Sequence, residues 1–224
     1  MPLIKRNPRP IERDKKEFRD DRLFIVACDD TFAPKQYFDS YKISRVHVHV
    51  IPTEDGTSSA PHVLDRLMQY DHDDDDELWM LLDTDHCIKG SHLAGFTNSL
   101  KEAREKGVKV ALSSPCFELW LLLHHVDEDQ IGTLTNATKT EKFLREKLDV
   151  YDKTRLDASR FPLSLVALAC ERAEKLENAM GNPEIPTTPM SQVHKLWRAI
   201  VAKGLPSQLP EELRNLLTVS KNGE

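Results

Sequence analysis

An uninterrupted apolar run that stops at two aspartates constrains this chain more than any other feature. The run Leu78-Trp79-Met80-Leu81-Leu82 is followed directly by Asp83-Thr84-Asp85. A short apolar run bounded by polar residues is typical of a strand that is buried on both faces, as in a parallel sheet. Open α/β sheets bind their ligands at the carboxyl ends of the strands. The two aspartates therefore stand where such a fold would place a site.

Asp83 and Asp85 are candidate ligands for a divalent metal ion. Side chains at positions i and i+2 of an extended segment point to the same side. Two carboxylates at such a short distance repel each other, and this repulsion raises the pKa of one of them unless a cation lies between them. A hard, oxygen-preferring ion such as Mg2+ suits the pair best. The alternative is that both are ordinary turn residues, because a D-x-D pattern alone is not specific.

The remaining apolar runs alternate with helical patterns, which predicts an α/β fold. Four runs are expected to form strands, at residues 23–28, 45–51, 78–82 and 108–112. Segments with helical spacing separate them, at residues 34–41, 61–70 and 91–106. This alternation predicts a mostly parallel four-stranded sheet with right-handed crossovers, flanked by helices.

We expect the chain to have three parts. Residues 1–21 are rich in Arg, Lys and Pro and are expected to form a basic, flexible arm. Residues 22–125 hold the predicted sheet. Residues 126–224 form a helical extension packed on that domain, with helices predicted near residues 137–148, 161–180, 189–203 and 210–217.

Composition excludes several classes of protein. The four cysteines are widely spaced and form no C-x-x-C pair, which argues against structural zinc and disulfides and favours a reducing cytoplasm. We find neither a membrane-spanning apolar run nor a signal peptide. The formal charge of −6 disfavours a free-standing, high-affinity nucleic-acid binder. A nucleic-acid substrate would therefore require a metal, a local basic patch or a partner.

Two further carboxylates are expected at the same rim of the sheet. Asp29 directly follows the first predicted strand, and Glu118 is the one charged residue in the apolar segment 116–123. We expect that segment to be a helix, in which a buried carboxylate must be paired, metal-bound or protonated. Because the carboxyl ends of parallel strands meet at one edge, Asp29, Asp83, Asp85 and Glu118 should converge.

Two other polar residues are weaker candidates for contact with a phosphate or substrate. His124 can approach the site if the predicted helix ends there; otherwise it is a polar residue that closes the helix. Lys153, in Tyr151-Asp152-Lys153, is a candidate phosphate contact, with an ordinary surface lysine as the alternative.

Four segments together resemble the RloB-like family, a branch of the Toprim (topoisomerase–primase) nucleases. They are Ile25-Val26-Ala27-Cys28-Asp29-Asp30 with Tyr37-Phe38, Leu82-Asp83-Thr84-Asp85, Ser113-Ser114-Pro115-Cys116-Phe117-Glu118-Leu119-Trp120-Leu121-Leu122-Leu123-His124, and Pro189-Met190-Ser191-Gln192-Val193-His194-Lys195-Leu196. The resemblance spans most of residues 22–200, and the third segment is the specific one.

The resemblance implies a Toprim-like sheet that binds Mg2+ or Mn2+ through Asp29, Asp83 and Asp85. Such proteins are similar to metal-dependent nucleases of bacterial antiphage or abortive-infection systems, often encoded beside an ATPase, and some relatives attack RNA including tRNA. We therefore expect a cytoplasmic nuclease that cleaves RNA or DNA, works with an ATPase partner and does not bind membranes. A homo-oligomer is compatible with this expectation. Asp29 would be a third ligand or the general base, and Glu118 would bind a second metal or orient a ligand.

This chain departs from the family pattern at the first site. The family usually has Cys-Glu-Gly there and Thr-Glu a few residues later. Here Asp29 replaces the glutamate, Asp30 the glycine, and Ala33-Pro34 the Thr-Glu pair. The carboxylate is one methylene shorter, and the glycine that lets the backbone approach a phosphate is lost. The alternative function is thus a catalytically degenerate Toprim module that binds a nucleic acid, a phage protein or an ATPase without cutting.

Overall fold

The structure is a computed structural model that describes residues 21–54, 56–85, 87 and 92–218. Its central sheet has the strand order β2-β1-β3-β4-β5 in this part of the chain. The strands are β1 (Arg22–Cys28), β2 (Val46–Ile51), β3 (Glu77–Asp83), β4 (Lys109–Ser114) and β5 (Met190–Ser191). β1 pairs in parallel with β2 and β3, and β3 pairs in parallel with β4. The predicted α/β fold with a mostly parallel sheet is confirmed.

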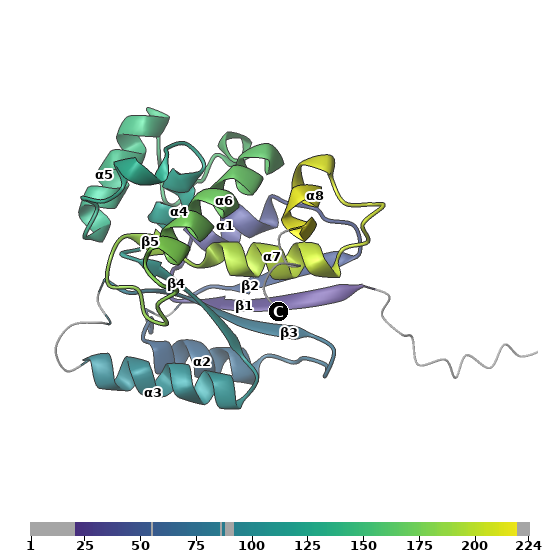
Figure 1. Cartoon of the computed structure of the whole chain (residues 1–224). Coiled ribbons are helices and arrows are strands. Elements are labelled where there is room, and N and C mark those ends of the chain that lie inside the picture. The colour runs from purple at the N-terminus through teal and green to yellow at the C-terminus, as the bar shows by residue number, and fades with distance from the viewer. Residues whose placement is uncertain (1–20, 55, 86, 88–91, 219–224) are drawn as a thin grey trace, which may run out of the picture.

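Helices cover both faces of the sheet (Figure 1). One face carries α2 (Ala60–Gln69) and α3 (His92–Glu105). The other carries α1 (Ala33–Asp39), α4 (Glu118–Leu123), α6 (Leu163–Ala179), α7 (Val193–Lys203) and α8 (Glu211–Thr218), with α5 (Ala137–Leu148) packed on α4. Short 3-10 turns lie at Glu128–Gln130 and Ala158–Arg160.

Alternation along the strands explains these two layers. In β1, Phe24, Val26 and Cys28 join the core under α1, α4, α6 and α7, whereas Ile25 and Ala27 join the core over α2 and α3. Successive side chains of a strand point to opposite faces, so an unbroken apolar run is what a strand between two helix layers requires. Helices that follow residue 126 share a core with the sheet.

The fifth strand was not predicted. Residues 189–203 were expected to be helical throughout, but Met190 and Ser191 pair antiparallel with Ser114 and Ser113 before α7 begins. The backbone N–H of Gln192 donates to the Leu112 carbonyl (2.8 Å), and its side-chain Oε1 accepts from the Leu112 N–H (3.2 Å). A two-residue strand has no periodicity of its own, so its pairing depends on the edge of β4.

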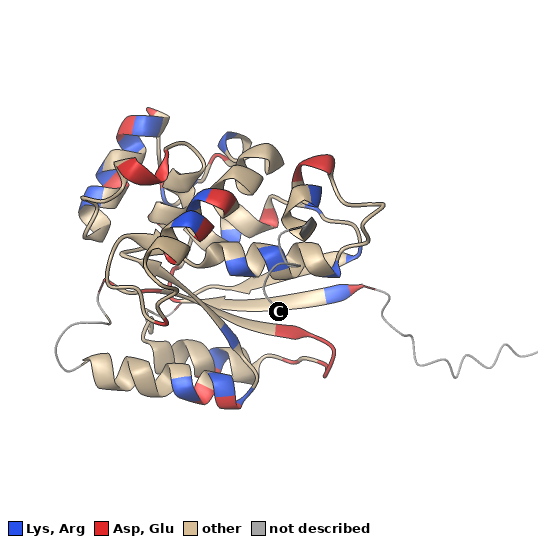
Figure 2. Ribbon diagram, viewed as in Figure 1, with Lys and Arg blue, Asp and Glu red and all other residues tan. Residues whose placement is uncertain are grey.

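Three other points concern the sequence predictions. The acidic run Asp71–Glu77 leads into β3 at the end of the sheet away from the strands' carboxyl ends, as the red ribbon in Figure 2 shows. No helix of the described residues has both the length and the apolar character of a membrane span. The predicted basic arm, apart from Asp21, lies outside the described residues.

Candidate functional site

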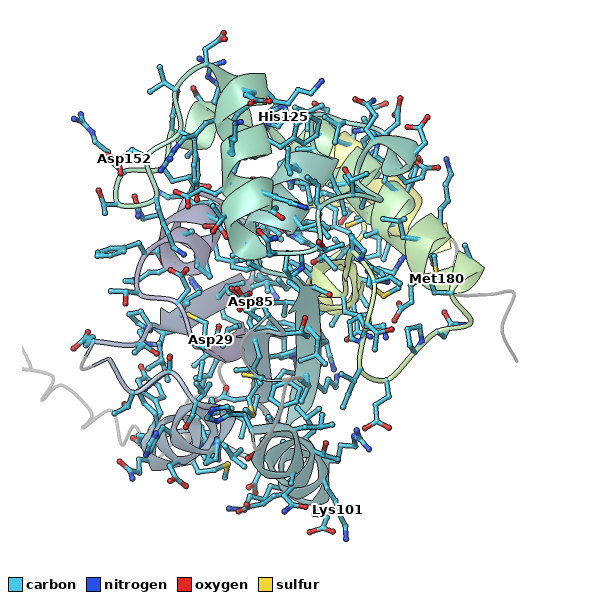
Figure 3. All side chains as sticks on the ribbon, turned by 90° about the vertical axis from the view of Figure 1, so that its left-hand side faces the viewer. Asp29, Asp85, Lys101, His125, Asp152 and Met180 are labelled. Carbon is cyan, nitrogen blue, oxygen red and sulfur yellow. The ribbon has the colours of Figure 1, made fainter. Side chains whose placement is uncertain are left out.

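A cavity of about 550 Å³ opens at the carboxyl ends of β1, β3 and β4. Because these strands are parallel, the polar residues that follow them meet at one edge of the sheet. Figure 3 looks onto this edge and shows Asp29 and Asp85 between the two helix layers. The Asp, Glu and Lys side chains that line the cavity are Asp29, Asp30, Asp83, Asp85, Glu118, Glu141 and Lys153.

The carboxylate that follows the first strand bonds to the backbone at the end of the third strand. Oδ2 of Asp29 accepts a hydrogen bond from the backbone N–H of Asp83 at 2.9 Å. Burial, opposed by that bond and assisted by Asp30 and Asp85, raises the pKa of Asp29 to about 7. Burial also raises the pKa of Asp83 above its ordinary value, with the negative charges of Asp29 and Glu118 adding to the effect. A cation would relieve this repulsion.

The segment after β3 is held against the end of β4. Thr84 donates its N–H to the carbonyls of Ser113 (3.0 Å) and Pro115 (3.2 Å), and Asp85 donates its N–H to Pro115 (3.1 Å). Asp83 and Asp85 both line the cavity, while the Thr84 between them is fully buried. The D-x-D pair thus faces one cavity, as the spacing predicted.

Glu118 is 2% exposed and is paired with two donors. Its Oε1 accepts from the hydroxyl of Tyr151 at 3.1 Å and lies 3.3 Å from Nζ of Lys153. Burial alone would lower the pKa of Lys153, but the negative charges of Glu118 and Asp30 outweigh burial and raise it. The lysine comes from the loop after α5 and reaches the cavity wall.

Asp30 was not predicted as a site residue. Its Oδ1 accepts from the N–H groups of Phe32 (2.6 Å) and Ala33 (3.1 Å) at the start of α1, and its Oδ2 lies 2.6 Å from Nζ of Lys153. An Asp a few residues before a helix commonly accepts hydrogen bonds from the backbone N–H groups two and three residues on, which is a signal that the sequence offers. That signal indicates the bonds from Phe32 and Ala33, but it does not indicate the ion pair with Lys153.

His124 is not brought to the cavity. It is 1% exposed and follows α4 inside the aromatic core. One ring nitrogen, Nδ1, lies 2.9 Å from the Trp120 carbonyl, and the other, Nε2, lies 3.0 Å from the hydroxyl of Tyr37. Burial lowers the pKa of His124 to about 3. A neutral histidine with both nitrogens bonded inside the core leaves nothing free for a phosphate, so we do not include His124 in the site.

The donor set suits a hard divalent ion. The oxygens of Asp29, Asp83 and Asp85 are carboxylate oxygens that repel one another without a cation. In the described residues no group of three or more His, Cys, Asp or Glu side chains is close enough to enclose a metal. Mg2+ commonly binds through one or two carboxylates and completes its shell with water and substrate phosphate. Two of these aspartates therefore suffice.

The cavity also has features that favour an anion. The first residues of α2, Ala60 and Pro61, and the first residue of α3, His92, lie in its wall. Helix N-termini carry partial positive charge and unpaired N–H groups, which suit phosphate. The carboxylates and these helix ends thus border one space.

Comparison with known proteins gives one finding. The family model for RloB-like protein matches residues 24–200, which includes every residue of the cavity named above. No curated protein and no solved structure matches the chain significantly.

Proposed function

The chain belongs to the RloB-like family, and from this membership and the acidic cavity we propose that it is a Toprim-type nuclease that hydrolyses phosphodiester bonds with Mg2+ or Mn2+. The observation that carries the proposal is the 2.9 Å bond between Oδ2 of Asp29 and the N–H of Asp83. It brings the acidic ends of β1 and β3 into one cavity. The substrate is a nucleic acid, either RNA such as tRNA or DNA.

Each aspartate has a role that follows from its position. Asp83 and Asp85 hold the divalent ion, which when bound neutralises the phosphate and activates water. Asp29 accepts the Asp83 N–H through Oδ2 and lines the cavity, where its carboxylate would accept a proton from the attacking water. With a pKa of about 7, Asp29 matches the requirement that a general base titrate near the working pH. The N-termini of α2 and α3 orient the phosphate.

The proposal extends to the setting of the protein. The family resemblance supports a role in antiphage defence together with an ATPase, whose contacts could offset the formal charge of −6. All four cysteines lie within the described residues and are free thiols, which supports a reducing cytoplasm.

Cleavage of tRNA and duplex DNA in Mg2+ or Mn2+, with the cognate ATPase present, tests the proposal. Wild type is expected to nick one of the two, and Asp83→Asn is expected to lose at least about 100-fold in rate. Asp74→Asn, an exposed aspartate in the acidic run, is the matched control and should retain activity. Equal rates for wild type and Asp83→Asn would refute the nuclease.

A second candidate, the non-cutting module, rests on a specific observation. Ala33 and Pro34 are buried at the start of α1, where the family pattern has Thr-Glu. Asp30, in the place of the family glycine, is engaged with Lys153. Calorimetry separates the two candidates: Mg2+ binding that Asp83→Asn does not change favours the non-cutting module.

A further inference from the structure

A lysine ammonium lies between two buried carboxylates at one wall of the cavity. Nζ of Lys153 is 2.6 Å from Oδ2 of Asp30 and 3.3 Å from Oε1 of Glu118. The carboxylate side chains are 5% and 3% exposed, so water does not screen them well. Without the lysine, two acids from different elements would be left close together with no cation.

The position of this ammonium is built from several elements. Gln36 on α1 donates Nε2 to the Lys153 carbonyl (3.3 Å) and accepts with Oε1 from the Leu156 N–H (2.8 Å). The hydroxyl of Tyr151 donates to the same Glu118 oxygen that faces the lysine. The loop is therefore anchored on both sides of Lys153, and the ammonium of this 38% exposed side chain is held by its two carboxylate partners.

We infer that the ammonium of Lys153 neutralises Asp30 and Glu118 permanently. It takes the position between these two carboxylates that a second divalent ion would otherwise occupy. The inference rests on the proposed function and deepens it: the protein uses one divalent ion, on the Asp83 side. It departs from two expectations of the sequence: that Glu118 binds a second metal, for which orienting a ligand was the alternative, and that Lys153 contacts a phosphate, for which an ordinary surface lysine was the alternative.

Charge and geometry support this assignment. The ammonium nitrogen forms ion pairs with both Asp30 and Glu118, and the lysine itself lines the cavity. A divalent ion placed beside it would meet strong repulsion from a like charge in a poorly screened site. The ammonium supplies positive charge at this wall at any metal concentration. Lys153 is thus a positioning residue for the carboxylates around it.

Counting bound Mn2+ by equilibrium dialysis and electron paramagnetic resonance tests the inference on the full chain. Wild type is expected to bind one ion, and Lys153→Met one more, because the neutral isostere leaves Asp30 and Glu118 without a cation. Lys153→Arg keeps the charge and should keep the wild-type number. The double variant Lys153→Met/Glu118→Gln should lose the additional ion. Lys109→Met, which removes a lysine paired with Glu77 at the other end of β4, is the matched control and should bind as wild type.

The inference is tested by the difference in the number of bound Mn2+ ions between wild type and Lys153→Met. The proposed function is tested by the number that wild type binds, so one can be refuted without the other. If Lys153→Met binds the same number of ions as wild type, the inference is overturned while the nuclease stands. If wild type binds none and Lys153→Met binds one, the inference holds and the ion proposed at Asp83 is lost.

Variants that keep Lys153 allow a second measurement, which does not depend on how well Lys153→Met folds. Glu118→Gln should retain the wild-type ion, whereas Asp83→Asn should lose it. Loss of the ion in Glu118→Gln would place the metal at the Lys153 wall and overturn the inference.

Discussion

Replacement of Asp29 by asparagine is expected to stabilise the protein while removing its activity. The pKa of Asp29 rises from 3.8 to about 7, chiefly because of burial, so the ionised form is disfavoured in the folded state. Asparagine removes the charge and can still accept the Asp83 N–H through Oδ1. A tenfold change in a protonation equilibrium corresponds to about 1.4 kcal/mol, so the shift corresponds to at most about 4 kcal/mol. Asp29 keeps partial contact with solvent, which reduces the expected gain to about 2 to 4 kcal/mol.

The sign and the pH window follow from the same shift. Below pH 3.8 Asp29 is mostly protonated in both folded and unfolded chains, so its burial does not lower the free energy of unfolding. As the pH rises towards 7, the unfolded chain ionises first, so wild type loses stability that Asp29→Asn keeps. The two proteins should therefore be about equal near pH 4 and differ fully above pH 7. Divalent ions should narrow the gap, because Asp29→Asn removes a negative charge beside the ion that Asp83 and Asp85 are proposed to hold, so wild type gains more from binding it.

Thermal unfolding in EDTA at pH 4.5, 6 and 8.5 measures the effect. For a chain of this size each kcal/mol moves the midpoint by roughly 2 to 4 °C. Asp74→Asn, in the exposed acidic run, should show no such pH dependence. If Asp29→Asn melts below wild type at pH 8.5, or if the difference does not grow with pH, burial does not govern this carboxylate.

Three further predictions test the surroundings of the site. Glu118→Ala should lower the free energy of unfolding in urea by about 2 kcal/mol because its buried donors lose their acceptor, and Glu118→Gln should cost less; equal costs would contradict this. Tyr37→Phe should cost about 2 kcal/mol by leaving His124 and an indole N–H unpaired, yet leave Mn2+ binding unchanged; reduced binding would return His124 to the site. Burial alone would raise the pKa of Glu177, but bonds from His194 and Lys195 lower it to about 2, so its stabilisation is present above pH 4.5 and lost as the pH falls. Glu177→Gln should therefore lower the melting temperature more at pH 7 than at pH 3, and a constant difference would contradict the pairing.

The sequence by itself determined the four parallel strands of the sheet and the acidic residues that follow them. A strand between two helix layers must be apolar on both faces, so β1 and β3 stand out as unbroken apolar runs that end at acids. Parallel strands end at the same edge, which is sufficient to bring Asp29 to Asp83 and Asp85 without knowing the loops. These features depend on local composition and on one rule of topology.

Only the tertiary structure decided which neighbours each of these groups has. Lys153 meets Asp30 and Glu118 because a loop of the helical extension folds back over α1. His124 faces the aromatic core because its ring bonds to the Trp120 carbonyl one turn earlier and to the hydroxyl of Tyr37 on α1. A contact between distant segments leaves no periodicity in either of them, and the direction of a side chain at a helix end depends on what packs around it.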